Sequence, residues 1–416
     1  MRIVSHTVSH TVLHTVSLRL PLAALVALLP LAARADVVTD WNLKAGAIVT
    51  AHQPGPPGSA TMALLQTAVY DAVNAVTRRY PTAVSATLKP APGASIEAAV
   101  AAVNRTVLLK LAPSQQAAIE AAYQAALTRI ADGANKTEGI ALGEQAVAEL
   151  LVRRAVKPAD MVYYRPVTRP GMYVPTVVPL NGDAVPVTNC WVLDRVDQFR
   201  PGPPPELTSA TWASDYNEIK ALGARTGSRR TPEQTDVARF WATTGPAVYF
   251  PLAQSLATQP GREVTRNARF LAVFAQVGVD AIDAVFDAKY TYQFWRPFTA
   301  IRNGDQDGND ATERDASWLP FIDTPMHPEY PCAHCTAAGA YGAVLSAEIG
   351  SGPSPKLSSV SPTLPGVTRS WSSVAEFVQE VSNARIYDGV HYRTSTEVGT
   401  LLGRQVGELA VGKLMK

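Results

Sequence analysis

Charged residues are scarce in this chain, and neither sign is in clear excess. Aspartate, glutamate, lysine and arginine make up 17% of the 416 residues, and the formal net charge is +2. Surface recognition of nucleic acid or of an anionic membrane needs a strong positive field, which this composition excludes. Any cationic site must therefore be local. The 47% of hydrophobic residues is typical of an ordinary packed core.

Long apolar runs are also lacking, apart from one near the start. The run LRLPLAALVALLPLAARA, residues 18–35, has an arginine on each side of its core and ends on Ala33-Arg34-Ala35. Its core is short for a membrane span, and Pro21 and Pro30 interrupt it. We therefore expect a signal peptide over residues 1–35, a secreted or periplasmic protein, and no membrane span after the signal is removed. A retained anchor is the alternative.

Histidine and cysteine are few. Three of the seven histidines precede the predicted cleavage point, which leaves His52, His327, His334 and His391. Cys332 and Cys335 have the spacing of a thiol–disulfide redox pair, although the preceding residues do not supply the strand that a thioredoxin-like site requires. A structural bridge is the other interpretation. Cys190 is expected to stay a free thiol or to pair with another chain.

No alternation of strands and helices appears, and alanine-rich segments with apolar spacings of three and four predict an all-α fold, a large helical bundle. We expect an N-terminal helical bundle over 36–155, an irregular proline-rich excursion over 156–208 that could wall a cleft, and a C-terminal bundle over 209–416 that carries the site. Residues 303–315 and 351–366 read as linkers. The acidic piece at 305–310 hints at calcium but lacks the glycine and glutamate positions of an EF-hand loop.

Three short segments contain the residues that suggest chemistry. Lys289 and Arg296 are seven residues apart, which on one helix is two turns, so that both side chains can reach one anion. A solvated basic stripe is the alternative, and the aromatic residues between them argue against it.

A proline and a histidine mark the second segment. Pro331 in the first turn of a helix would leave the N–H groups of Cys332, Ala333 and His334 unpaired, which favours an anion. In the third segment Arg385 and His391 are six apart, and a turn at Asp388-Gly389 would let both side chains aim at one point.

These three segments, in this order, resemble the signature of the superfamily of vanadium-dependent haloperoxidases and type-2 phosphatidic acid phosphatases. Residues 62–74 and 230–234 also resemble segments of the haloperoxidase branch. The resemblance implies an all-helical bundle and a vanadate cofactor, or phosphate in the same site. It implies an oxyanion-binding set made of Lys289, Arg296, Cys332, Ala333 and Arg385.

The resemblance also implies roles for the histidines. His391 would be the metal ligand to vanadium in a peroxidase, or the nucleophile that forms a phosphohistidine in a phosphatase. His334 would be the acid/base catalyst. His327 is a candidate for the halide site, because bromoperoxidases tend to carry histidine there and chloroperoxidases phenylalanine.

Some positions depart from the family pattern. Cys332 and Ala333 replace serine and glycine, and a thiol is a weaker donor than a hydroxyl. Thr244 stands where haloperoxidases place an aspartate that supports the catalytic histidine, and Ser395 stands where phosphatases place one. The sequence therefore predicts that no carboxylate orients either histidine.

The function we expect is a vanadate-dependent haloperoxidase that uses hydrogen peroxide and a halide, with a lean toward bromide. A periplasmic acid phosphatase on the same site is the first alternative, and a non-catalytic oxyanion-binding protein is the second. The partners would be small molecules, namely peroxide, halide or a phosphate ester. Nucleic acid is not expected, and a homo-oligomer is compatible with the sequence.

Overall fold

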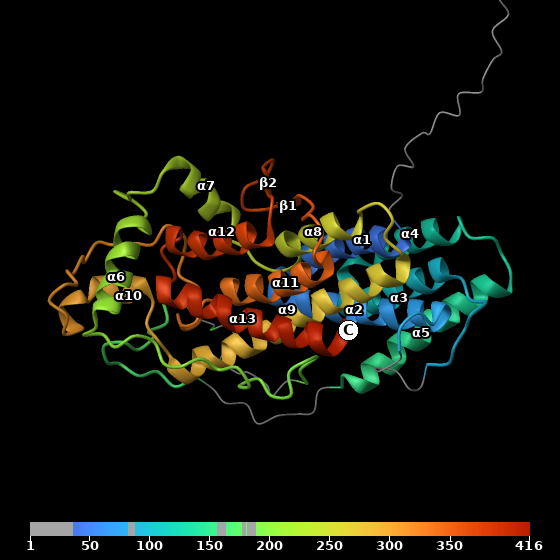
Figure 1. The fold of residues 1–416 in the computed structure, drawn as a ribbon, viewed down its shortest axis with the longest axis horizontal. Helices are drawn as coiled ribbons and strands as arrows, with labels where there is room; N and C mark the ends of the chain where they lie inside the picture. Colours follow the sequence, from blue (N-terminus) through green and yellow to red (C-terminus); the bar gives the residue numbers. More distant parts are fainter. Residues whose placement is uncertain (1–35, 82–87, 156–163, 177–179, 181–188) are drawn as a thin grey trace, which may run out of the picture. The chain divides into compact units, whose positions relative to one another are not determined.

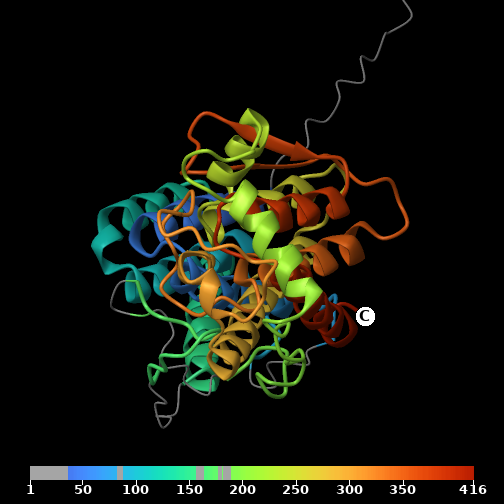
Figure 2. The same ribbon diagram turned by 90° about the vertical axis from the view of Figure 1, so that its left-hand side faces the viewer.

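The computed structural model describes residues 36–81, 88–155, 164–176, 180 and 189–416. Residues Ala35–Lys416 form one compact unit whose regular secondary structure is helical apart from two short strands (Figures 1 and 2), which confirms the predicted all-α class. The predicted signal peptide and residues 156–163, 177–179 and 181–188 of the predicted excursion lie outside the described residues. Among the described helices, none is long and apolar enough to cross a membrane.

The described residues contain thirteen α-helices and two short 3-10 turns. These are α1 (Val37–His52), α2 (Pro56–Thr77), α3 (Ile96–Leu111), η1 (Pro113–Gln115), α4 (Gln116–Leu127), α5 (Ala134–Arg153), α6 (Ala210–Leu222), α7 (Pro232–Phe240), α8 (Pro246–Ala257), α9 (Val264–Tyr292), α10 (Pro297–Arg302), η2 (Gly304–Gln306), α11 (Ala333–Ile349), α12 (Val374–Tyr387) and α13 (Arg393–Leu414).

Helix α9 is the longest, and it runs along α2, α11 and α13, as Figure 1 shows. Small residues let these helices approach closely. A Cβ atom added at Gly403 of α13 would lie 1.8 Å from the carbonyl oxygen of Thr336 on α11, so only glycine fits there. This contact fixes α13 against α11, which together carry or adjoin two of the predicted site segments.

Part of the predicted linker over 351–366 forms regular structure, so that prediction is wrong there. Strand β1 (Leu357–Val360) pairs antiparallel with β2 (Thr368–Trp371). Leu357 and Ser359 are buried, and the Ser359 hydroxyl donates to Val248 O on α8 at 2.6 Å. Packing against α8 therefore holds a hairpin that the Ser/Pro composition did not suggest.

The acidic segment at 305–310 contributes a buried carboxylate that accepts hydrogen bonds within the fold. Asp307 is buried, and its carboxylate accepts from the indole N–H of Trp212 at 2.8 Å and from the Thr312 hydroxyl. The carboxylate with the deepest burial in this piece is thus satisfied by protein donors, which does not support the calcium interpretation.

Candidate oxyanion site

Lys289 and Arg296 do not lie on one helix, contrary to the prediction. Helix α9 ends at Tyr292, Gln293 adopts a left-handed φ of 50°, and Arg296 is the extended N-cap of α10. Pro297 accounts for the extended conformation of Arg296, because the residue before a proline is disfavoured in the helical region. The two side chains reach the same segment by different routes.

Lys289 and Arg296 both donate hydrogen bonds to the segment that leads into α11. The ammonium of Lys289 donates to Pro328 O at 2.9 Å and to Glu329 O at 2.7 Å. Arg296 donates from Nε to His327 O at 3.0 Å and from Nη1 to Val390 O at 2.8 Å. The predicted stripe is therefore buried, and neither side chain is solvated.

The predicted excursion reaches the Arg296 segment. Trp295 N–H donates to Gly171 O at 3.0 Å, and Tyr173 N–H donates to Gln293 O at 2.6 Å. The Tyr173 hydroxyl is buried and has no partner among the described residues. Burial raises the pKa of Tyr173 to about 12, against the effect of the Arg296 charge.

Arg385 supplies the third buried cation, from the last turn of α12. Its Nη1 donates to Trp241 O at 2.8 Å and to the Asp388 carboxylate at 2.5 Å. Its Nε is buried and finds no acceptor in the described part of the chain. A buried donor without a partner is costly unless a ligand satisfies it, so Arg385 fits an oxyanion.

The start of α11 differs in detail from the prediction. Pro331 lies outside the helix, Cys332 is the N-cap and Ala333 is the first helical residue. The Cys332 N–H is already used, because it donates to Ser395 O at 3.1 Å. Within the described residues, the N–H groups of Ala333 and His334 have no acceptor. Two of the three predicted backbone donors therefore remain available for an anion.

Cys332 and Cys335 are joined by a disulfide. The Cys332 sulfur accepts from Cys335 N–H at 3.2 Å, so it caps the helix and carries no S–H donor. Both cysteines are fully buried, which agrees with the structural bridge and argues against thiol exchange with another protein.

His391 lies where the predicted turn places it. Helix α12 ends at Tyr387, Gly389 has a φ of 78°, and α13 begins at Arg393. The N–H groups of Val390 and His391 both donate to Arg385 O at 3.3 Å, which ties the turn to the end of α12. Because of this turn, Arg385 and His391 can serve one site although they are six residues apart.

The prediction that no carboxylate orients a histidine is wrong for His391. The ring atom Nδ1 of His391 lies 2.8 Å from Glu329 Oε1, and both residues are buried. Burial raises the pKa of Glu329 to about 7, against the charges of Lys289 and Arg296. The pKa of His391 is held well below its ordinary value by burial and by the nearby cations, so the imidazole is neutral.

Glu329 and Asp388 are the two site residues that the sequence reasoning missed. Each is an acidic residue amid apolar, aromatic or glycine neighbours, in a chain with only 17% charged residues. The isolation of these two acidic residues is the sequence feature from which a buried functional role could have been predicted. Asp388 is fully buried against Arg385, and burial raises its pKa to about 7.

His334 is supported by the backbone. Its Nε2 lies 3.2 Å from Thr243 O, so Nε2 carries the proton and Nδ1 is the free nitrogen. Thr244, the position of the expected aspartate, contacts the Tyr249 hydroxyl instead. Burial and the Arg385 charge keep the pKa of His334 well below its usual value.

His327 lies beside Arg296 and an aromatic ring. Its Nδ1 is 3.0 Å from Arg296 Nη2, and its ring centroid is 5.0 Å from that of Phe286. The guanidinium can only donate to Nδ1, but Nδ1 also lies 3.1 Å from Pro328 O, which can only accept, so the two contacts favour opposite tautomers of the neutral ring. The half-buried His327 ring therefore lies at the edge of the cationic frame formed by Lys289, Arg296 and Arg385.

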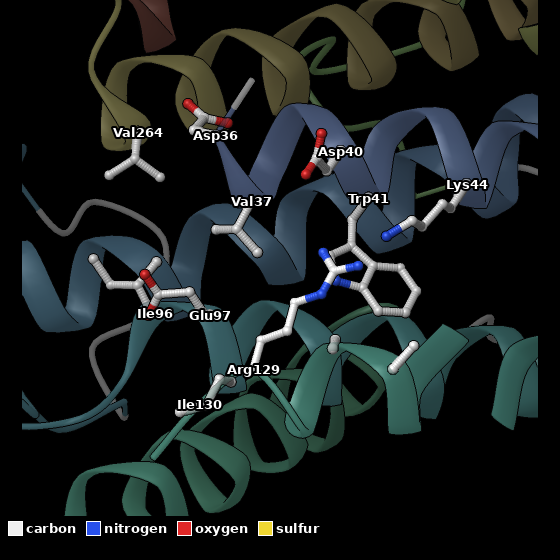
Figure 3. Close-up of a pocket in the computed structure, with 12 residues that line it drawn as sticks. Asp36, Val37, Asp40, Trp41, Lys44, Ile96, Glu97, Arg129, Ile130 and Val264 are labelled. Atoms are coloured by element: carbon white, nitrogen blue, oxygen red, sulfur yellow. The ribbon is translucent and has the colours of Figure 1, made fainter. Parts of the chain in front are cut away.

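A separate cavity of about 540 Å³ lies against α1, α3 and α4 (Figure 3). Trp41, Lys44 and Arg129 line it, and Lys44 Nζ lies 5.3 Å from the indole centroid of Trp41. The predicted site residues do not line it. The chain's own Lys44 lies over the aromatic wall, so we assign no ligand to this cavity.

Comparisons with known proteins show which family and which fold this chain resembles. Residues 269–416 match the family model described as the VCPO second helical-bundle domain. The vanadium chloroperoxidase of Curvularia inaequalis is 27% identical over 175 residues, which cover 35% of this chain and 28% of that protein. The match thus spans little more than a quarter of the relative's length.

Solved structures resemble nearly the whole described chain. A bacterial vanadium-dependent iodoperoxidase is 22% identical, with 91% of this chain and 96% of that chain covered and a TM-score of 0.74. An apo-type bacterial vanadium-dependent chloroperoxidase is 16% identical, with 88% and 95% covered and a TM-score of 0.69. The resemblance inferred from the sequence is therefore confirmed: this chain has the fold of the vanadium-dependent haloperoxidases, and its residues 269–416 match the model of the VCPO second helical-bundle domain.

Proposed function

We propose that this protein is a vanadate-dependent haloperoxidase, which oxidises a halide with hydrogen peroxide. The observation that carries the proposal is a neutral, carboxylate-bound His391 inside a frame of three buried cations. Lys289, Arg296, Arg385 and the N–H groups of Ala333 and His334 would hold the vanadate oxygens, and His391 Nε2 would be its nitrogen ligand. Bound vanadate supplies the Lewis acid that activates peroxide toward the halide.

The residues around the vanadate position have two roles, namely anion binding and proton transfer. The cations and amides bind and orient the anion in a buried site, where their charges are weakly screened. His334 presents an unprotonated Nδ1, which can take a proton from an incoming peroxide and return it later. The low pKa of His334 keeps this nitrogen available as a base.

Bromide is the halide we propose, with His327 at its site. In the tautomer with its proton on Nε2, His327 and the neighbouring Arg296 would stabilise an anion at the edge of the cationic frame. Relatives with this fold include an iodoperoxidase and chloroperoxidases, so iodide and chloride are the competing substrates. A His327→Phe variant should lose bromide turnover relative to chloride turnover.

An acid phosphatase is the second candidate, supported by the same Glu329–His391 contact. A histidine held by a carboxylate is suited to attack phosphorus, and the cationic frame suits phosphate as well as vanadate. Water rather than peroxide would complete that reaction.

Two assays on the purified protein test these proposals, namely bromide-dependent peroxidation after addition of vanadate, and hydrolysis of an aryl phosphate. We expect vanadate-dependent peroxidation, and we expect His391→Ala to lower it by at least about 100-fold, since a ligand to the vanadium is lost. His52→Ala is the control, because His52 contacts Ser114 on η1. Aryl phosphate hydrolysis without peroxidation would favour the phosphatase, and an active His391→Ala variant would refute the site.

We also propose that the protein is secreted or periplasmic, with a signal peptide cleaved before Asp36. The buried Cys332–Cys335 disulfide supports an oxidising compartment. Mass spectrometry of the exported protein would show whether Asp36 is its first residue.

A further inference from the structure

Both ring nitrogens of His391 are engaged, and the two partners are of opposite kinds. Arg296 Nη1 lies 3.2 Å from Nε2, and Glu329 Oε1 lies 2.8 Å from Nδ1. A guanidinium only donates hydrogen bonds, whereas an ionised carboxylate only accepts them. A single neutral tautomer satisfies both contacts, with the proton on Nδ1 and the lone pair on Nε2.

Glu329 is itself fixed at three points of the site. Its backbone N–H donates to Phe294 O at 2.9 Å, and its backbone oxygen accepts from the Lys289 ammonium at 2.7 Å. Its Oε1 also accepts from Tyr392 N–H at 3.1 Å. Glu329 thus contacts three parts of the site. These are helix α9, the separate segment that contains Phe294 and Arg296, and the turn that contains His391.

We propose that Glu329 is a positioning residue, which holds the His391 proton on Nδ1 and keeps the Nε2 lone pair directed at the oxyanion. The inference deepens the proposed function and rests on it in so far as the oxyanion is vanadate. A carboxylate on the far nitrogen of a ligating histidine fixes its ring orientation and raises its basicity. Without Glu329, the Nδ1 proton would lose its acceptor and only the Arg296 contact would favour the lone pair on Nε2, so the ligating nitrogen would be protonated part of the time.

A simpler role for Glu329 is to compensate the buried charges of Lys289 and Arg296. Three substitutions separate the two roles. Glu329→Gln keeps an acceptor oxygen at the same reach and removes the charge, and its nitrogen would lie near the Ser395 hydroxyl, which is beside the Glu329 carboxylate and can accept from an amide. Glu329→Asp keeps the charge and shortens the reach by one methylene. Glu329→Leu removes both.

The test measures the tautomer of His391 and the affinity for oxyanions, neither of which requires turnover. Nitrogen NMR of histidine-labelled full-length protein reports which ring nitrogen is protonated, and calorimetry with orthovanadate and with inorganic phosphate gives the two dissociation constants. Asp215→Asn is the matched control, because Asp215 is a buried carboxylate that accepts from Thr394 N–H and touches no predicted site residue.

We expect His391 to be protonated on Nδ1 in the wild-type protein, in Glu329→Gln and in Asp215→Asn. Glu329→Leu and Glu329→Asp should raise both dissociation constants by about 10- to 100-fold, the usual cost of losing such a contact. If the Glu329→Leu variant does not fold, the Glu329→Asp and Glu329→Gln variants distinguish positioning from charge compensation. Wild-type oxyanion affinity in Glu329→Asp together with weak binding in Glu329→Gln would overturn the inference in favour of charge compensation. Unchanged affinity and an unchanged His391 tautomer in Glu329→Leu would also overturn it.

Failure of the proposed haloperoxidase function would give a different result from failure of the Glu329 inference. In that case the wild-type protein would bind vanadate or phosphate with the expected tautomer, yet show no vanadate-dependent peroxidation. Glu329 would then position His391 for another reaction on the same oxyanion.

Discussion

At the scale of single residues, the buried charges around the site nearly cancel. Lys289, Arg296 and Arg385 are at most 1% exposed, and Glu329 and Asp388 are fully buried. Three cations less two carboxylates leave one positive charge when all five are ionised. Burying unpaired charges is costly, so the carboxylates stabilise the frame, and the remaining charge favours an anion. Burial raises the pKa of both Glu329 and Asp388 to about 7.

Asp215 gives a residue-scale prediction about stability and pH. Burial raises its pKa from 3.8 to about 6 in the folded protein. A raised pKa means that its contribution to stability is full below about pH 4 and is lost as the pH rises through about 6. A difference of about two between the folded and unfolded pKa corresponds to about 3 kcal/mol at most.

Asp215→Asn cannot ionise and keeps the acceptor for Thr394 N–H. Relative to the wild-type protein, its free energy of unfolding should therefore increase between pH 4 and pH 7, by up to about 3 kcal/mol. Urea unfolding of both proteins at the two pH values measures this. An equal difference at pH 4 and pH 7 would contradict the assignment.

At the scale of elements, the N-terminus of α11 combines a helix cap with an anion site. The disulfide leaves the Cys332 sulfur as an acceptor only. In Cys332→Ser/Cys335→Ala, the serine hydroxyl can cap the helix and also donate to an oxyanion. We expect vanadate to bind about three- to tenfold more tightly, as one added hydrogen bond would give.

The same variant should be less stable by about 2 kcal/mol, because a short disulfide loop is lost. Cys335→Ala alone, which leaves a thiol at position 332, is the control for affinity. Calorimetry and thermal unfolding provide the two measurements. Equal vanadate affinity in the single and double variants would show that position 332 does not contact the anion.

The contact between α11 and α13 gives a second prediction at this scale. In Gly403→Ala the new methyl group would overlap Thr336 O, 1.8 Å away. The helices must separate, so we expect a loss of about 3 kcal/mol or more and weaker vanadate binding. In Gly46→Ala of α1, nothing lies within 4 Å of the added Cβ, and alanine should be neutral or stabilising by up to about 1 kcal/mol. Thermal melting that moves equally in both variants would be evidence against this close approach.

At the scale of the whole molecule, the compact unit begins where the predicted signal peptide ends. The carboxylate of Asp36 caps α1 by accepting from Thr39 N–H at 2.8 Å, and it also accepts from Asn267 on α9 at 2.7 Å. A chain of residues 36–416 should therefore fold and bind vanadate like the full chain.

Within that shortened chain, Asp36→Ala should lower the free energy of unfolding by about 1 kcal/mol through loss of the cap. Asp36→Asn, which can still cap, is the control. Chemical denaturation compares the three proteins. If the 36–416 chain were much less stable than the full chain, residues 1–35 would contribute to the fold, and the predicted cleavage point would be wrong.

The sequence alone determined the helical class and most of the residues of the site. Helical periodicity is a local property of side-chain spacing, and the order of the three segments that contain Lys289, Arg296, His334, Arg385 and His391 was visible along the chain. The turn before His391 was also predictable, because Asp388-Gly389 is a local turn signal.

Only the tertiary structure decided how these residues meet. The break after Tyr292, the Cys332 amide bonded to Ser395 and the hairpin on α8 depend on packing between distant segments. The contact between Glu329 and His391 joins residues 62 apart in sequence. Hydrogen bonds of that kind have no periodic or local signature, so the carboxylate that orients His391 could be found only in the folded protein.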